Sequence, residues 1–600
     1  MCGYFFHNSK NIIKRSKPEI LVIKDYLKER GPDNFNYIQK KNFSMFHSRL
    51  SIIDRNKRSN LPFADNKKEY FMVFNGEIYN FIELKKKLIN EGINFNTKSD
   101  TEVLFKLIIH KGIKETLRII QGMFSFVFYD VKKNKFYGAR DHFGQKPFYF
   151  YKSNNNFLAS TNIRPILKNI KNKNLNLASM KQYLCSNGII PVNNTFFSGI
   201  SSLPAGSYIT IHRNKCVIKK YFKPIDMFHK KKYSKFKDMD EKSVIKILDQ
   251  KIKKAIERHL ISDTKIGLAC SGGIDSALIL KYANEINKEI LTLTNTSKGI
   301  ERLSKLVPKI LKKNNISKKR SYFIKQNKNN YIGTLSKLTQ NNLFPARWGG
   351  GPPMNNLCEY AKKKNIKVIL SGDGLDEYFC GYNSFNKSLN NKNNKYGLHN
   401  ILLLSKKFGI NKNIISKFYN KITKSKKIIS KKITFIKDKK ERKIITNSFL
   451  DTEYFLQSCT LPHSDEYSMN NSIELRNPLL DLDLVEFCLN LPGKFKISRQ
   501  SNFKNKFIMK KLAIKKYGKF INKAKEGTRN YSKYISNKKF WNFNKFQILK
   551  TIKINKNLHY KEIFKLINLE MILRATSSNN YNYLRDIVTK KGFREFKLTQ

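Results

Sequence analysis

The sequence predicts two domains, a strand-rich α+β domain followed by an α/β domain built on a parallel sheet. Its 600 residues exceed the length at which single hydrophobic cores stop growing, and 40% of them are hydrophobic. Strand patterns with few helices fill residues 2–212, whereas helices and strands alternate within residues 241–600. Between them, in residues 213–240, Lys, Pro, His and Asp crowd and apolar periodicity fades, which predicts a linker.

The first domain is expected to contain at least four strands and two helices. Apolar runs or alternation predict strands at residues 43–53, 70–75, 124–129 and 146–151. Helical spacing of apolar residues is found between these strands, at residues 79–91 and 101–110.

The second domain shows regular alternation of the two kinds of element. Helices are predicted at residues 243–259, 276–286 and 353–364, and strands at residues 265–270, 290–294 and 368–370. This alternation is typical of a parallel sheet covered by helices. Residues 386–447 are rich in Asn and Lys, and we expect a helical insertion or a mobile loop there.

Composition argues against several classes of protein. No apolar run reaches the ~20 residues of a membrane span, so no membrane partner is expected. Residues 1–14 contain charges and no long apolar segment, so no secretory signal is visible and a cytoplasmic location is expected. The eight cysteines follow no framework spacing, which argues against disulfides and structural zinc.

The strong positive charge raises the question of nucleic-acid binding. The net charge is +72, from 117 basic and 45 acidic residues. Lysine is abundant along the whole chain, whereas a dedicated site would gather Arg, Lys and aromatic residues on one stripe. A solvated lysine surface is therefore favoured, and no specific nucleic-acid partner is expected. An RNA-binding or tRNA-modifying protein is the distant alternative, and it would bind RNA in a strongly salt-dependent way.

Cys2 is the first residue that suggests chemistry. It becomes the amino-terminal residue once Met1 is removed, and a small second residue permits that removal. An α-amine, with an ordinary pKa of ~8, can accept the thiol proton directly or through a water molecule. The alternatives are a cysteine without a role, or a lipoprotein cysteine, which would need an apolar segment before it.

Three segments supply the groups that glutamine recognition requires: Arg49-Leu50-Ser51-Ile52-Ile53, Asn75-Gly76-Glu77 and Ser99-Asp100. A guanidinium fork at Arg49 can bind an α-carboxylate, and carboxylates at Glu77 and Asp100 can hold an α-ammonium. The Asn75 amide and the Gly76 N–H could form an oxyanion hole. Structural alternatives are a hairpin turn at Asn75-Gly76, a helix N-cap at Ser99 or Asp100, and surface pairing of Arg49.

A glycine-rich motif follows a predicted strand and opens a helix in the second domain: Ser271-Gly272-Gly273-Ile274-Asp275-Ser276. Glycines let backbone N–H groups approach a pyrophosphate, the helix N-terminus favours the anion, and two hydroxyls add donors. The motif lacks the Gly-Lys-Ser/Thr of a Walker A loop, so γ-phosphate transfer is not indicated. An ordinary glycine turn is the alternative.

Six motifs, in order, resemble the class II glutaminase domain of asparagine synthetases: Met1-Cys2-Gly3, Arg30-Gly31-Pro32-Asp33, Arg49-Leu50-Ser51-Ile52, Asn75-Gly76-Glu77-Ile78-Tyr79-Asn80, Gly122-Met123-Phe124 and Arg140-Asp141-His142-Phe143-Gly144. The resemblance implies an N-terminal-nucleophile hydrolase fold, an αββα sandwich with two facing antiparallel sheets. It implies catalytic roles for Cys2, Asn75 and Gly76. It also implies that glutamine binds at Arg49, Leu50, Ser51, Ile52, Ile53, Asn75, Gly76, Glu77 and Asp100.

The second domain resembles the same family at Leu370 to Glu377 with Gly381-Tyr382, at Ser468-Met469, and at Glu474 to Asp481. The resemblance implies a PP-loop ATP pyrophosphatase domain that releases AMP and pyrophosphate. It implies that ATP binds at Ala269, Ser271, Gly272, Gly273, Asp275, Ser276, Ser371 and Gly372, and that Asp275 and Asp376 hold Mg²⁺. Lys506 matches a mobile lysine that neutralises charge as an adenylate forms, and Asp373 matches a catalytic position.

The predicted activity is glutamine-dependent asparagine synthesis, from aspartate, glutamine and ATP. Some positions depart from the family: Asp373 replaces the usual Glu, Lys510 the usual Arg and Cys380 the usual Gly, and residues 341–355 lack an acidic residue before proline. The alternative is therefore an amidotransferase of the same architecture that acts on another carboxylate, such as a sugar acid. Use of free ammonia and the oligomeric state, a homodimer included, are left open.

Overall fold

The structure is a computed structural model. It describes residues 1–9, 14–186, 193–213, 215–296, 305–325, 331–346, 351–382, 405–498, 505–521, 535–550, 558–577 and 583–591. Within these ranges, no helix combines the length and the apolar character that crossing a membrane requires.

Two six-stranded antiparallel sheets form the first domain. In spatial order, the first sheet consists of β10 (Ile200–Ser202), β8 (Tyr149–Lys152), β9 (Asn156–Ser160), β1 (Gly3–Ser9), β3 (Phe43–Arg49) and β2 (Asn34–Gln39). The second sheet consists of β12 (Lys215–Lys220), β11 (Ser207–His212), β7 (Lys135–Arg140), β6 (Gly122–Asp130), β5 (Tyr70–Ile78) and β4 (Phe63–Ala64).

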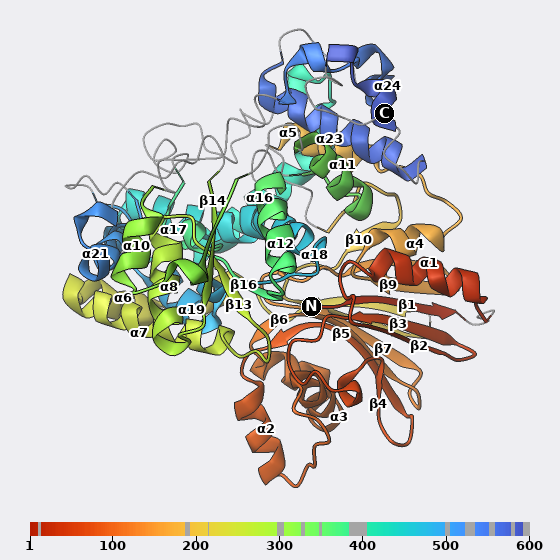
Figure 1. Cartoon of the computed structure of the whole chain (residues 1–600), viewed down its shortest axis with the longest axis horizontal. Coiled ribbons are helices and arrows are strands. Elements are labelled where there is room, and N and C mark those ends of the chain that lie inside the picture. The colour runs from red at the N-terminus through yellow and green to blue at the C-terminus, as the bar shows by residue number, and fades with distance from the viewer. Residues whose placement is uncertain are drawn as a thin grey trace.

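Aromatic side chains fill the space between these sheets. Phe6 and Phe43 of the first sheet approach Phe136 and Phe71 of the second, with ring centroids 4.9 and 5.2 Å apart. Outside the second sheet lie α2 (Phe81–Asn90) and α3 (Asp100–Ile119), and outside the first lie α1 (Lys17–Leu27) and α4 (Ile163–Lys168) (Figure 1). The predicted αββα sandwich is confirmed by this layer order.

A five-stranded parallel sheet forms the centre of the second domain, as predicted. Its order is β15 (Ser321–Ile324), β14 (Leu291–Asn295), β13 (Ile266–Ala269), β16 (Val368–Leu370) and β17 (Glu474–Arg476). Helices near it include α7 (Glu241–His259), α8 (Ile274–Ile286), α10 (Val307–Lys313), α12 (Gly351–Lys363), α19 (Leu482–Asn490) and α21 (Phe507–Tyr517). Because the carboxyl ends of parallel strands share one edge, the loops after β13 and β16 meet there.

Further helices follow the sheet in the chain. They include α11 (Tyr331–Asn342), α13 (Leu375–Tyr378), α16 (Lys412–Lys432), α17 (Lys439–Leu450), a π-helix (Asp451–Thr460), α18 (Leu461–Met469), α20 (Gly493–Lys496), α23 (Tyr560–Ser577) and α24 (Tyr583–Ile587). The described part of the segment 386–447 is thus largely helical, and its residues 386–404 lie outside the described residues.

Most predicted elements differ from the observed ones at their ends, the following three among them. The strand predicted at 43–53 ends at Arg49, because the carbonyls of Ile53 and Asp54 accept hydrogen bonds from the Arg49 side chain, and that of Ile52 from the Asp263 N–H, instead of from a neighbouring strand. The strand predicted at 146–151 begins only at Tyr149. The helix predicted at 101–110 continues to Ile119, across a non-helical Gly112 with φ +73°.

The predicted linker, residues 213–240, contains regular structure. Strand β12 pairs with β11 at the edge of the second sheet, and α5 (Leu177–Cys185) and α6 (Lys230–Asp238) lie before and after this hairpin. Most side chains of β12 are exposed, so an edge strand of this kind shows no apolar pattern in the sequence. The domain boundaries at 212 and 241 stay predictions.

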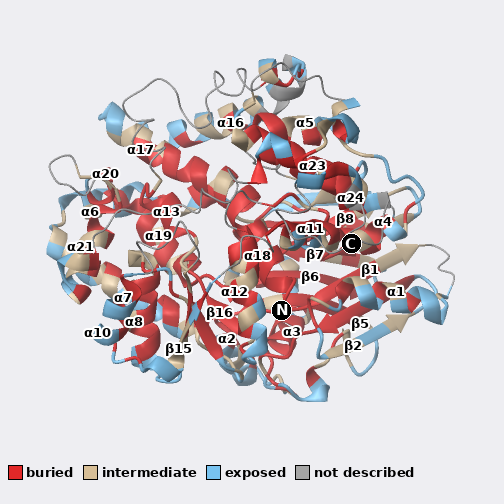
Figure 2. Cartoon of the chain, turned by 45° about the horizontal axis from the view of Figure 1, so that its top comes forward, coloured by how far each residue is buried: buried red, intermediate tan, exposed pale blue. Residues whose placement is uncertain are grey.

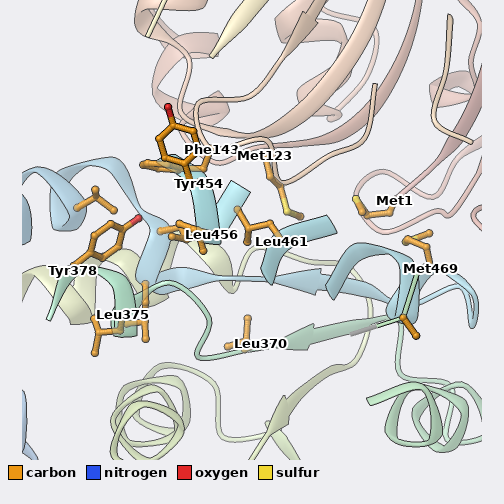
Figure 3. Packing of buried hydrophobic residues seen from close by; sticks show 14 of the residues in the cluster. Met1, Met123, Phe143, Leu370, Leu375, Tyr378, Tyr454, Leu456, Leu461 and Met469 are labelled. Carbon is orange, nitrogen blue, oxygen red and sulfur yellow. The ribbon is translucent and has the colours of Figure 1, made fainter. Parts of the chain in front are cut away.

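Buried apolar residues continue from the first domain into the second (Figure 2). Met1 and Met123 of the first domain belong to the same cluster as Leu370, Leu456 and Leu461 of the second (Figure 3). The contact between the domains is therefore packed like a domain interior, as is typical of permanent interfaces.

Candidate active sites

Cys2 lies directly before β1, in a buried position. Its backbone N–H donates to Asn75 Oδ1 at 2.9 Å, and Arg30 Nε donates to its carbonyl at 3.1 Å. Burial raises the pKa of the Cys2 thiol, so formation of a thiolate requires a proton acceptor. The α-amine that removal of Met1 would create is the group nearest in the chain that can accept this proton.

Asn75 places an unpaired donor beside this cysteine. Its side chain is fully buried, and Nδ2 has no hydrogen-bond partner among the described residues. An unpaired buried donor costs about 1–3 kcal/mol, and beside a nucleophile it is the kind of group that forms an oxyanion hole. The hairpin-turn alternative is excluded, because Asn75 and Gly76 lie inside β5 and pair with Ser125 and Phe124.

Gly76 lies in close contact with the backbone of β6. A Cβ atom at this position would lie 2.1 Å from the carbonyl oxygen of Met123. A larger residue would therefore push β5 away from β6 and displace the neighbouring Asn75 amide.

Arg49 orders the loop that follows β3. Nη1 donates to Asn56 O and Asn60 Oδ1 at 3.0 and 2.8 Å, and Nη2 donates to Ile53 O and Asp54 O at 3.2 and 2.6 Å. Its burial excludes the surface-pairing alternative. These bonds occupy all four terminal N–H groups, so binding of an α-carboxylate by Arg49 stays a prediction and requires some of them to be exchanged.

The other predicted residues of this loop are Leu50, Ser51, Ile52 and Ile53, and residues of the second domain contact Ser51 and Ile52: the Ile52 carbonyl accepts the Asp263 N–H at 3.0 Å, and Lys367 reaches Ser51 through Asp33. Lys367 Nζ lies 2.6 Å from Asp33 Oδ2, and the same oxygen accepts the Ser51 N–H at 2.7 Å. The second domain thereby helps to fix the loop in which the sequence predicts glutamine binding.

Glu77 and Asp100 belong to a buried group of carboxylates that includes Glu474 of the second domain. Arg476 Nη2 lies 3.2 Å from Glu77 Oε1, and the amino-terminal ammonium lies 3.1 Å from Glu474 Oε2. Burial, with repulsion from Glu474 and Asp100, raises the pKa of Glu77 well above its usual value. Burial also raises the pKa of Asp100 to about 6. An additional cation, such as an α-ammonium, would relieve this repulsion.

The Asp100 side chain does not cap the helix that it begins, so its carboxylate is available to the buried group of carboxylates. Ser99 is the N-cap of α3, and its hydroxyl accepts the Thr101 N–H at 3.1 Å. The Asp100 carboxylate instead accepts the Ile78 N–H at 2.9 Å, which anchors it at the end of β5.

Glutamine binding at these carboxylates is expected to weaken in acid. Asp100 carries its negative charge above pH about 6 and loses it below, so kcat/KM for glutamine hydrolysis should fall as the pH decreases from about 7 to about 5. Measuring kcat/KM across this range tests the expectation. A value that stays constant from about pH 7 to about pH 5 would contradict it.

Residues 271–273 form the turn between β13, which ends at Ala269, and α8, and residues 274–276 are the first residues of α8. Ser276 Oγ lies 3.1 Å from Ser271 Oγ, and the Gly273 N–H donates to Ser271 Oγ at 3.3 Å. Gly272 has φ +81°, a conformation that favours glycine. The turn thus presents backbone N–H groups at the N-terminus of a 13-residue helix, which suits a pyrophosphate.

The loop after β16 reaches the same place. A Cβ atom on Gly372 would lie 3.1 Å from Asp275 Cβ, so this loop and the turn are in close contact. Lys506 Nζ lies 2.5 Å from Asp275 Oδ2 and 2.7 Å from Asp376 Oδ1. Burial alone would lower the pKa of Lys506, but the two carboxylates raise it, so the ammonium stays charged.

Asp373 is held by two hydroxyl groups. Its Oδ2 accepts from Ser371 Oγ at 3.2 Å and from Ser464 Oγ at 2.9 Å. Gly374, without a capping side chain, is the N-cap of α13. A helix-capping role for Asp373 is therefore excluded.

Several residues reach these sites without having been predicted there, Ser464 and Arg476 among them. Ser464 comes from α18, and no motif in the sequence marks it. Arg476 lies in the segment 474–481, which the sequence analysis noted without assigning this side chain a role. Glu474 and Arg476 lie in one short buried strand, where charged residues are rare. This feature of the sequence could have indicated a buried ion pair.

Two family models match the chain. Residues 1–222 match the model described as a glutamine amidotransferase domain, and residues 248–521 match the model described as asparagine synthase. Among curated proteins, asparagine synthetase 1 (glutamine-hydrolyzing) of Bacillus subtilis is 27% identical over 561 residues, which cover 86% of this chain and 84% of the relative.

Two further relatives are named as a synthetase and as an amidase. Asparagine synthetase B (glutamine-hydrolyzing) of Escherichia coli is 28% identical and covers 65% of this chain and 66% of the relative. Amidase chyE of Penicillium rubens is 23% identical and covers 86% and 84%. Similarity to solved structures is low: glutamine phosphoribosylpyrophosphate amidotransferase from B. subtilis gives a TM-score of 0.28 at 14% identity, covering 48% of this chain and 65% of that chain.

Proposed function

Because the chain belongs to the asparagine synthetase family and joins a glutamine amidotransferase domain to a synthetase domain, we propose that it converts aspartate, glutamine, ATP and water to asparagine, glutamate, AMP and pyrophosphate. The observation that carries the proposal is the unpaired Asn75 Nδ2 beside Cys2, in a chain that also brings Asp275 and Asp376 together around Lys506.

The first half-reaction takes place at Cys2. Its sulfur attacks the side-chain amide carbon of glutamine, and the α-amine takes the thiol proton and passes it to the leaving nitrogen. The C–N bond breaks, ammonia leaves, and a glutamyl thioester remains. Asn75 Nδ2 and the Gly76 N–H stabilise the negative oxygen of the tetrahedral intermediate. Water then cleaves the thioester, which gives glutamate and restores the thiol.

The second half-reaction takes place at the edge of the parallel sheet. The side-chain carboxylate of aspartate attacks the α-phosphorus of ATP, the bond to pyrophosphate breaks, and an acyl adenylate forms. The turn 271–273 and the N-terminus of α8 bind the departing pyrophosphate, and Lys506 neutralises negative charge beside it. Ammonia then attacks the acyl carbon, and AMP leaves.

The carboxylates of Asp275 and Asp376 suit Mg²⁺. Asp275 Oδ1 is buried and has no hydrogen-bond partner among the described residues, and the other oxygen already faces a cation, the Lys506 ammonium. Hard carboxylate oxygens are the ligands that Mg²⁺ prefers. When bound, the ion would supply positive charge to the pyrophosphate leaving group.

Ammonia has to reach the adenylate without meeting bulk water. Water would protonate ammonia to a non-nucleophilic ammonium ion, and it would also hydrolyse the adenylate. The apolar cluster that joins Met1 and Met123 to Leu370 and Leu461 lies between the domains and supports an enclosed route (Figure 3).

A product assay tests the proposed function. Purified protein incubated with glutamine, ATP, Mg²⁺ and aspartate should yield asparagine, glutamate, AMP and pyrophosphate, identified by mass. Glutamate formation without asparagine would support the second candidate, an amidotransferase that acts on another carboxylate. Two points favour that candidate: Asp373 departs from the Glu that the family resemblance implies at this position, and two relatives are named amidases. A homodimer and a cytoplasmic location stay predictions.

Replacing Asp373 with asparagine should lower aspartate-dependent pyrophosphate release at least about a hundredfold. The change removes a charge that Ser371 and Ser464 hold beside the ATP loop, and loss of one such electrostatic contact costs about this much. Ser464→Ala removes only one of the two donors and should cost less. Normal turnover per folded molecule of the Asp373→Asn variant would remove Asp373 from the site.

A further inference from the structure

Arg476 contacts the glutamine site although it belongs to the second domain. Its Nη2 lies 3.2 Å from Glu77 Oε1, and its Nε donates to Glu474 Oε1 at 2.6 Å. Nη1 donates to the carbonyls of His259 and Ile261 at 2.8 and 2.6 Å. The side chain is completely buried and the planar guanidinium is held from three sides, so it cannot turn away from Glu77 without breaking several bonds.

The backbone of Arg476 contacts the loop of the proposed ATP site. In the parallel sheet it is the register partner of Leu370, and its carbonyl accepts the Ser371 N–H at 2.9 Å. Ser371 begins the loop that carries Gly372 and Asp373. Arg476 therefore links two places. One is the sheet edge at which ATP is proposed to bind, and the other is the Glu77 carboxylate, which is proposed to hold the α-ammonium of glutamine.

Charge explains why the glutamine site needs this arginine. When ionised, Glu77, Asp100 and Glu474 carry three negative charges, and Arg476 is the cation that faces Glu77 and Glu474. The ammonium beside Glu474 belongs to Met1, whose removal the mechanism requires, so the α-ammonium of glutamine would offset negative charge that Arg476 alone leaves over. Without the arginine, Glu77 would face two other buried carboxylates and would bind a proton instead of a substrate cation.

We propose that Arg476 is a positioning residue of the glutamine site: it fixes the Glu77 carboxylate and favours its ionised form, which binds the α-ammonium of the substrate. The site in the first domain is then complete only when the second domain is docked against it. This inference rests on the proposed function, because it assumes that glutamine is the substrate bound at Glu77.

Steady-state glutamine hydrolysis by the full-length chain tests this role. Arg476→Lys keeps a charge but loses the fork that reaches both Glu77 and Glu474, so KM for glutamine should rise at least about tenfold while kcat changes by less than about threefold. Ammonia-dependent synthesis, which does not use the glutamine site, should be retained and shows that the variant is folded.

A double-mutant cycle separates action through Glu77 from a general structural effect. Glu77→Gln alone should raise KM, and adding Arg476→Lys should then raise it little further. Multiplicative effects of the two changes would overturn the inference. If Arg476→Lys does not fold, Arg476→Gln combined with Glu474→Gln avoids leaving Glu474 as an unpaired buried carboxylate. Glu77 still loses its arginine in this variant, so the variant must show the same rise in KM.

Arg258 offers a matched control at the same domain contact. Its Nη1 lies 3.2 Å from Gln121 Oε1 and 3.1 Å from Asp481 Oδ2 and does not touch Glu77. Arg258→Lys should leave KM for glutamine unchanged, and an equal rise in KM would overturn the inference. Wild-type protein without glutaminase activity would overturn the proposed function as well, whereas an active wild type and an Arg476→Lys variant of normal KM would overturn this inference alone.

Discussion

Replacing Cys2 with alanine abolishes glutamine hydrolysis, with a loss of at least about a thousandfold, and leaves ammonia-dependent synthesis largely intact. Loss of the nucleophile removes the only route through a thioester, and no other described cysteine lies beside the Asn75 amide. The second site uses other residues, Asp275 and Asp376 among them, so its chemistry continues when ammonium salts replace glutamine. Glutamate release and asparagine formation, measured in parallel, check both halves.

Cys216 supplies the control for this change. It is a free cysteine on the edge strand β12, away from β5, and Cys216→Ala should leave both activities unchanged. Intact-mass measurement of active wild-type protein should show that Met1 has been removed. Undiminished glutaminase activity in Cys2→Ala, or full activity with Met1 still attached, would show that Cys2 is not the nucleophile.

Replacing Asp275 with asparagine stops formation of the adenylate while glutamine hydrolysis continues. The change removes one of the two carboxylates that surround Lys506 and that are proposed to hold Mg²⁺. Charge stabilisation of a leaving group by a metal is worth several kcal/mol, at about 1.4 kcal/mol per factor of ten, so pyrophosphate release should fall at least about a thousandfold. Asp376→Asn should have the same effect.

Asp249 is a suitable comparison in the same domain. It pairs with Lys516 at 2.8 Å on the outer helices, away from the sheet edge, so Asp249→Asn should release pyrophosphate at the normal rate. Pyrophosphate release is measured with aspartate and ATP present, and glutamate release is measured in the same samples. Normal pyrophosphate release by the Asp275→Asn variant would show that its carboxylate holds no essential cation.

Local sequence was sufficient to predict the parts that depend on neighbouring residues. The alternation of residues 241–370 predicted the parallel sheet, and the glycines at 272 and 273 predicted the turn that opens α8. Periodicity and turn chemistry act over a few residues, so they can be read directly. Strand β12 was missed for the same reason, because its side chains are exposed and its pairing with β11 leaves no apolar pattern.

By itself, then, the sequence predicted the two fold classes and the main elements along the chain, and it supplied the candidate groups of both proposed sites, from Cys2 to Asp376. Only the tertiary structure decided which of these groups meet. Lys506 bonds to a carboxylate 231 residues away, Ser464 to one 91 residues away, and Arg476 crosses the domain contact to Glu77. The physical reason is that such contacts depend on how the elements pack and on where each buried side chain points, and periodicity along one segment carries no information about either.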